Sequence, residues 1–139
     1  MTELAPREYW EGNLSLEDFA EQLSHCRIKA EDDSTQILVE MADSDKSEFV
    51  VTRQHLITLC DDVVKKKLLA QDDLNTIAYI LILSAHYSWD GNSEDGEVVA
   101  TTIFDWDSPE INFPLSNANI KRWKTYLITG KNDLIRKES

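Results

Sequence analysis

Apolar residues near the start of the chain recur at helical spacing. Leu16, Phe19, Ala20 and Leu23 follow the i, i+3, i+4, i+7 pattern of a helix that turns one face to a core. Ser15 stands directly before them, and a serine hydroxyl there can accept a hydrogen bond from a free N–H group of the first turn. The sequence therefore predicts a helix that begins after Ser15.

Two more amphipathic helices are predicted further along the chain. The first covers about 53–69 and is capped by Thr52. The second covers about 117–128 and is capped by Ser116, and Gly130 is a suitable residue to end it. Each presents one apolar side, so we expect both to pack against a shared core.

The segment 73–88 is apolar on almost every side. A helix of this kind is normally buried, although a buried strand could also produce such a run. Its length and its polar start, with Asp72 or Asp73 as the cap, favour a helix. We predict that it is the central helix and that Ile80 and Leu81 lie in the core.

Three segments are rich in residues that favour strands. Residues 37–41 and 48–51 are separated by the polar loop 43–47, which predicts an antiparallel hairpin. Residues 98–106 alternate in the manner of a third strand. Because helices and strands come in blocks, the sequence predicts an α+β fold with about four helices around a buried central helix and a small antiparallel sheet.

The length of 139 residues fits one domain, which we expect to cover 1–139. Residues 1–13 look like an irregular lead, and 131–139 a charged tail that frays. The first ten residues have no apolar core of a signal peptide, and the longest apolar run is far shorter than the roughly 20 residues of a membrane span. We therefore expect a cytoplasmic protein.

The overall charge excludes two classes of partner. The chain has 14 basic and 26 acidic residues and a formal net charge of −12. Binding to nucleic acid requires a basic face that neutralises phosphates, and an anionic membrane surface also attracts basic segments. The sequence therefore predicts neither a nucleic-acid-binding protein nor a membrane-binding one.

Signatures of catalysis are missing from the sequence. The two cysteines do not make a disulfide framework, and no histidine stands at metal-ligand spacing from another histidine or a cysteine. The acidic loop 90–96 lacks the glycine and the final glutamate of an EF-hand. Paired carboxylates for acid–base chemistry remain open, because many folds with 26 acids bring two together. We predict a protein that is not an enzyme and that binds no cofactor or metal.

The charge is distributed unevenly along the chain. No Lys or Arg occurs from Leu68 to Ile120, and between Trp89 and Glu110 acidic residues are interleaved with aromatic ones. Aromatic side chains supply contact area to an interface and carboxylates steer a basic partner, although a solvated acidic rim is an alternative interpretation. The predicted recognition face for a cationic protein consists of Trp89, Asp90, Glu94, Asp95, Glu97, Asp105, Trp106, Asp107 and Glu110.

One part of this stretch resembles a known class of proteins. The segment 104–115 reads FDWDSPEINFPL, and the segment 119–123 reads NIKRW. Over residues 97–127 the chain resembles the small immunity proteins of bacterial polymorphic-toxin systems, including those of contact-dependent growth inhibition. The resemblance implies a cytoplasmic protein that binds and blocks one cognate toxin domain.

Two hypotheses of different classes follow. The first is an immunity protein that is monomeric alone, forms a heterodimer with a cationic nuclease toxin domain and occludes its active site. The second is an acidic secretion chaperone or small adaptor, since acidic chains of this length resemble type III secretion chaperones, which usually dimerise. The oligomeric state of the isolated chain helps to separate them.

Overall fold

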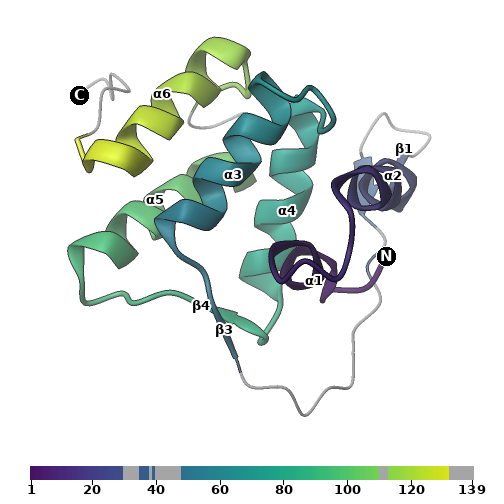
Figure 1. Ribbon diagram of the computed structural model, residues 1–139, viewed down its shortest axis with the longest axis horizontal. Coiled ribbons are helices and arrows are strands. Elements are labelled where there is room, and N and C mark those ends of the chain that lie inside the picture. The colour runs from purple at the N-terminus through teal and green to yellow at the C-terminus, as the bar shows by residue number, and fades with distance from the viewer. Residues whose placement is uncertain (30–34, 38, 40–47, 110–112, 132–139) are drawn as a thin grey trace.

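The computed structural model describes residues 1–29, 35–37, 39, 48–109 and 113–131. These residues form a helical structure with two very small sheets (Figure 1). The helices are α1 (Ala5–Trp10), α2 (Leu16–Cys26), α3 (Arg53–Val64), α4 (Gln71–Leu83), α5 (Glu94–Asp107) and α6 (Asn117–Thr129). The strands are β1 (Arg27–Lys29), β2 (Thr35–Ile37), β3 (Phe49–Val50) and β4 (Tyr87–Ser88).

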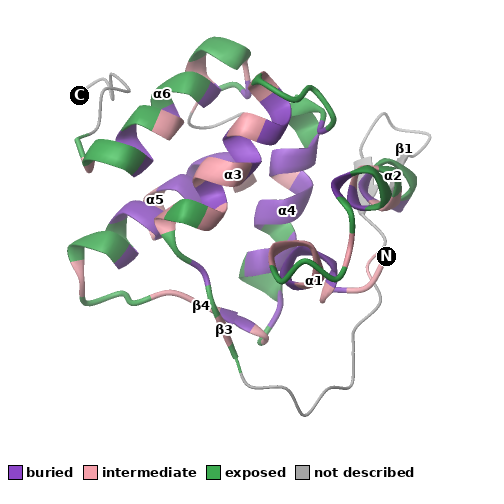
Figure 2. Ribbon diagram, viewed as in Figure 1, coloured by how far each residue is buried: buried purple, intermediate pink, exposed green. Residues whose placement is uncertain are grey.

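Helix α4 joins two groups of helices. Helices α1 and α2 lie on one side of it, and α3, α5 and α6 lie on the other (Figure 1). The most extensive helix pairs are α3 with α6 and α4 with α5. The buried residues form one hydrophobic cluster between the helices, whose outer sides are exposed (Figure 2).

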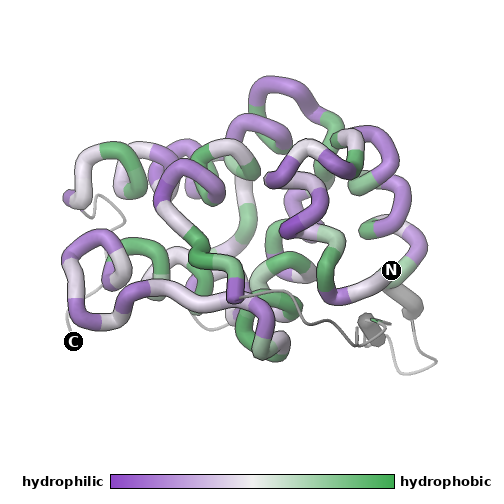
Figure 3. Tube along the Cα trace, turned by 60° about the horizontal axis from the view of Figure 1, so that its bottom comes forward, coloured by the Kyte–Doolittle hydropathy of each residue, from purple (hydrophilic) through white to green (hydrophobic). Residues whose placement is uncertain are grey.

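Hydrophobic and hydrophilic stretches alternate along the helices, so that each helix can turn one side to this core (Figure 3). Among the described residues, no helix combines the length and the apolar character that crossing a lipid bilayer requires. The largest fully buried side chains include Trp106, Trp123 and Phe19, which lie on three different helices. The core is therefore shared among the helices rather than confined to one pair.

The capping signals at α2 and α6 are confirmed. The Asp18 N–H donates to the Ser15 hydroxyl over 3.1 Å, and the Asn119 N–H donates to the Ser116 hydroxyl over 3.2 Å. Gly130 ends α6 with a φ of 76°, a left-handed conformation that glycine adopts without steric cost. These short-range signals determine where α2 starts and where α6 starts and ends.

Helices α3 and α4 also lie where their patterns predict them, although both are shorter. Helix α3 follows Thr52 but ends at Val64, and α4 begins one residue before Asp72. The cap position of α4 is Ala70, not Asp72 or Asp73. Asp73 lies in the first turn, and its carboxylate accepts the Ala70 N–H over 2.8 Å. Ile80 and Leu81 are buried, as predicted.

The predicted α+β class is wrong, and the main reason is α5. The segment predicted as a strand over 98–106 lies inside this helix. Its buried positions include Val98, Val99, Thr102 and Ile103, which recur with the period of a helix. The Ser93 hydroxyl accepts the Gly96 N–H over 3.0 Å and starts the helix, so packing and capping outweigh the β-branched composition.

The predicted antiparallel hairpin is also wrong. Strand β3 pairs with β4 in parallel, with Phe49 opposite Tyr87, and β2 pairs back to β1 with Ile37 opposite Arg27. The loop predicted over 43–47 lies outside the described residues. A parallel pair needs a long connection, which here contains α3 and α4, so no local signal could reveal it.

The predicted irregular lead over 1–13 contains a helix. Buried polar contacts hold α1 against the rest of the protein: the Tyr87 hydroxyl donates to the Glu3 carbonyl over 2.6 Å and accepts the Arg7 N–H over 3.1 Å. The Tyr9 hydroxyl donates to the Asp62 carboxylate over 2.5 Å. A search for apolar periodicity cannot detect such anchors.

Most of the tail predicted over 131–139 lies outside the described residues.

Candidate functional site

Helix α4 leaves an apolar side uncovered. Tyr79, Ile82 and Leu83 are 38%, 39% and 52% exposed, and their i, i+3, i+4 spacing places them on one side of the helix. The opposite side is fully buried, with Leu74 and Ile77 among its members. The expectation that this helix is buried all round is therefore wrong.

Helix α5 borders the uncovered side of α4. Asn75 lies one turn before Tyr79 on the same side, and its amide nitrogen donates to the carbonyls of Trp106 and Asp107 over 2.9 and 3.1 Å. The start of α4 therefore lies beside the end of α5. Tyr79 therefore lies one helical turn from this contact between the two helices.

Phe104 is a further exposed apolar residue, which lies on α5. Its side chain is 52% exposed, and its ring meets the half-buried ring of Trp89 edge to face, with 6.4 Å between the centroids. Aromatic pairs of this kind add contact energy beyond simple burial. We call the surface formed by Tyr79, Ile82, Leu83, Trp89 and Phe104 the α4–α5 face.

Acidic residues gather at one end of α5, next to Trp89 in the sequence. Asp90, Glu94, Asp95 and Glu97 are all exposed. Three of them lie in the first turn, where negative charge is stabilised by the positive end of the helix dipole. The α4–α5 face itself comes entirely from the stretch that has no Lys or Arg.

Two of the predicted interface residues lie in the core. Asp105 is 2% exposed and accepts a hydrogen bond from the Trp123 indole N–H over 3.1 Å. Trp106 is fully buried and packs edge to face on Trp123, with 6.3 Å between the ring centroids. Neither side chain can contact a partner, because α5 turns both of them toward α6.

The last two residues of the predicted recognition face are Asp107 and Glu110. Asp107 is half-buried at the end of α5, and Glu110 lies outside the described residues. The structure thus brings Trp89, Asp90, Glu94, Asp95 and Glu97 together on the surface and removes Asp105 and Trp106 from it. Sequence reasoning missed Tyr79, Ile82 and Leu83, which it had placed in a wholly buried helix.

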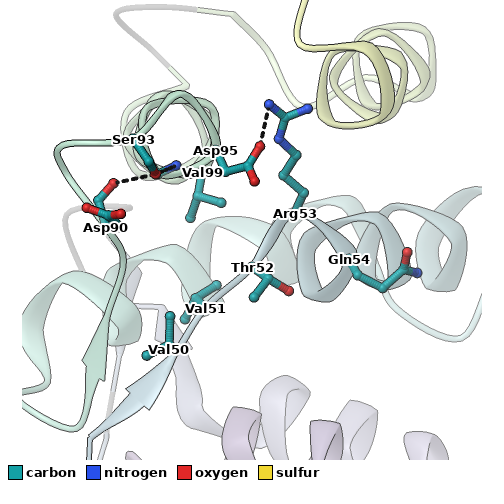
Figure 4. Close-up of a pocket in the computed structure, with 10 residues that line it drawn as sticks. Val50, Val51, Thr52, Arg53, Gln54, Asp90, Ser93, Asp95 and Val99 are labelled. Atoms are coloured by element: carbon teal, nitrogen blue, oxygen red, sulfur yellow. Dashed lines mark hydrogen bonds and ion pairs between the residues drawn. The ribbon is translucent and has the colours of Figure 1, made fainter.

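A hollow of about 350 Å³ lies between the start of α3 and the start of α5 (Figure 4). Val50, Val51 and Val99 supply apolar parts of its lining, and Asp90 and Asp95 contribute carboxylates. Apolar walls beside carboxylates suit the stem and charged head of a basic side chain.

Arg53 from this chain already occupies part of the hollow's acidic end. One terminal nitrogen of its guanidinium lies 2.8 Å from the Asp95 carboxylate (Figure 4). The other terminal nitrogen donates to the Leu127 carbonyl over 3.4 Å. Asp95 is mostly exposed, so this ion pair contributes little to stability. It does lower the negative charge available to a partner, which leaves Asp90, Glu94 and Glu97 as the stronger candidates for steering.

The groups that this region exposes are mainly apolar side chains and carboxylates. The Ser93 hydroxyl donates to the Asp90 carbonyl in the preceding loop and accepts the Gly96 N–H in the first turn of α5. Throughout the part of the chain that the structure describes, no three His, Cys, Asp or Glu side chains converge in a way that could hold a metal ion. The region offers exposed apolar contacts and carboxylates, which are the components of a protein–protein interface.

Gly96 is required where the acidic loop meets α5. A Cβ atom at this position would lie 1.3 Å from the Asp90 carbonyl oxygen, a distance that only a backbone shift could relieve. We expect Gly96→Ala to lower the free energy of unfolding by about 1–3 kcal/mol despite the higher helix propensity of alanine. Urea titration followed by circular dichroism measures this loss.

Gly91 in the same loop provides the control, because a Cβ atom there would meet nothing within 4 Å. Gly91→Ala should therefore unfold near the wild-type urea concentration. Equal midpoints for the two variants would show that the loop does not approach α5 as closely as described.

A comparison of the chain with protein-family models, with characterised proteins and with solved structures finds no match. The resemblance to immunity proteins thus stays a prediction.

Proposed function

We propose that this protein is an immunity protein that binds a cognate cationic toxin domain through the α4–α5 face. The observation that carries the proposal is the exposed apolar surface of α4 and α5, which lies in the stretch without Lys or Arg and has acidic residues at one end. The exposed parts of these side chains make no contact that stabilises the fold, so they remain open to a partner. Together they provide a contact surface for another protein.

The composition of the surface favours a basic partner. The centre is aromatic and aliphatic, which is where interfaces concentrate their binding energy. Asp90, Glu94 and Glu97 would steer a positively charged protein toward this centre and fix its orientation. A nuclease has a basic active site because it must hold phosphates, so a partner of this class would present the complementary charge.

The proposal also states how the protein works. It acts in the cytoplasm as a non-enzymatic inhibitor, and one copy binds one toxin domain and covers its active site. Trp89 and Phe104 contribute the aromatic contact, and the exposed apolar side chains of α4 extend it. No catalytic step is needed, since exclusion of the substrate is sufficient.

A secretion chaperone or adaptor is the second candidate, and the uncovered side of α4 also favours it. An apolar helix side can bind an unfolded effector segment or a second copy of the chain. Such a chaperone should dimerise alone, whereas the immunity protein stays monomeric until it meets the toxin. Native mass spectrometry of the isolated protein distinguishes the two.

We expect the neighbouring gene to encode a large toxin, and the test uses the C-terminal domain of that toxin. Co-expression should restore growth to cells that produce the toxin domain, and the purified proteins should form a 1:1 complex. The association rate should fall steeply as ionic strength rises, because the attraction between opposite charges is screened. Growth arrest despite co-expression, with no complex by native mass, would contradict the proposal.

A further inference from the structure

A second hollow lies between α3 and α6, and none of its residues belongs to the α4–α5 face. Its volume is about 360 Å³, which falls within the range of roughly 300–1,000 Å³ for small-molecule pockets. The residues that line it are Cys60, Asp61, Val64, Lys65, Ile120, Lys121 and Lys124.

The floor of this pocket is apolar. Ile120 and Cys60 are buried, and Val64 is half-buried beside them. Burial raises the pKa of the Cys60 thiol, so the sulfur stays uncharged at neutral pH and adds to the apolar floor. The apolar part of a ligand could therefore rest here with little desolvation of polar groups.

The lining residues at the mouth are mainly cationic. Lys65, Lys121 and Lys124 line the pocket together with one acidic residue, Asp61. The Lys124 ammonium lies 2.7 Å from Asp61 and the Lys65 ammonium 3.9 Å from it, while Lys121 is exposed. The three ammonium groups outnumber the carboxylate by two, in a chain whose formal net charge is −12.

We propose that the α3–α6 pocket binds a small amphipathic anion, a carboxylate on an aliphatic or aromatic body. The body would lie on Cys60, Val64 and Ile120, and the carboxylate would meet Lys121 and the ammonium groups around Asp61. A cationic ligand would place like charges side by side, and a neutral one would leave the excess positive charge without a counter-ion. The volume fits a molecule of this size rather than a folded partner.

A bound anion would link α3 to α6, the most extensive helix pair in the protein. A ligand that binds the folded state and not the unfolded one stabilises the fold by mass action. Binding should therefore raise the melting temperature in a saturable manner. This role does not depend on the toxin partner, so the inference and the proposed function can fail separately.

The test compares three probes that share one chain length. Octanoate should bind at one site by calorimetry and raise the melting temperature, and octylammonium and octanol should bind at least tenfold more weakly. If octylammonium or octanol binds as tightly as octanoate, or if octanoate at millimolar concentration gives neither heat nor stabilisation, the proposal is wrong.

Three variants locate the site. Lys121→Glu reverses a charge at the mouth and should weaken octanoate binding at least tenfold, and Val64→Phe should do the same by filling the pocket. Lys131→Glu is the matched control, since it makes the same charge change at an exposed position beyond α6. Equal affinities of Lys121→Glu and Lys131→Glu for octanoate would overturn the inference, even if octanoate binds elsewhere.

Discussion

Asp105→Lys should prevent the protein from folding or lower its free energy of unfolding by about 3–5 kcal/mol. The carboxylate is buried and holds the indole N–H of Trp123, which itself packs on Trp106 in the core. The substitution removes this acceptor and buries an ammonium group without a counter-ion. Urea unfolding followed by tryptophan fluorescence measures the loss.

Glu97→Lys is the matched control, because it makes the same charge reversal on the same helix at an exposed position. Its free energy of unfolding should fall by only about 1 kcal/mol, the cost of placing a positive charge near the positive end of the helix dipole. If the two variants unfold at the same urea concentration, the helical register of α5 is wrong, and Asp105 would return to the surface.

Leu81→Ala should lower the free energy of unfolding by roughly 2–5 kcal/mol. Leu81 lies on the buried side of α4, where α2 and α5 pack against the helix. Removing most of its side chain loses apolar contacts and leaves a cavity that the surrounding helices cannot fully close. Denaturant titration at one temperature gives the value directly.

Leu83 on the same helix offers a control with the same chemistry, since its side chain is largely exposed. Leu83→Ala should cost less than about 1 kcal/mol, as little apolar area leaves the core. A loss below about 1 kcal/mol for Leu81→Ala as well would place α4 at the periphery and contradict the described packing.

The sequence predicted those helices whose ends carry local signals. The serine caps of α2 and α6, the apolar periodicity of α3, and the length and polar start of α4 depend only on neighbouring residues. Pattern and structure therefore agree at these four helices. Helix α5 has an equally good cap in Ser93, but its β-branched residues favoured a strand. Helix α1 was missed because hydrogen bonds with residues far away in the sequence hold it in place. Tyr9 of this helix bonds to Asp62, and Tyr87 bonds to Glu3 just before the helix.

Because residues 98–106 were predicted to form a strand, buried residues of α5 were assigned to the recognition face. In a strand, Phe104 and Trp106 would share one side, whereas in a helix they point in different directions. The structure exposes Phe104 and buries Trp106. This difference follows from the period of a helix as against that of a strand, and composition alone does not reveal it. The acidic character of the stretch was visible in the sequence because charge does not depend on the fold.

The missed residues of α4 have a related cause. Tyr79, Ile82 and Leu83 are as apolar as the residues on the buried side, so hydropathy does not distinguish the two sides. What distinguishes them is how many helices pack around α4, which is a property of the tertiary structure. A run that is apolar on all sides therefore has two explanations, a buried helix or a helix with a partner.

The measurement that tests the central claim most directly is the affinity of three alanine variants for the cognate toxin domain by surface plasmon resonance. Phe104→Ala and Ile82→Ala remove exposed apolar contacts from the α4–α5 face and should each weaken binding tenfold or more. Ile128→Ala removes a side chain that is 58% exposed on α6 and should bind as the wild type does. If all three variants bind within twofold of the wild type, the α4–α5 face is not the interface.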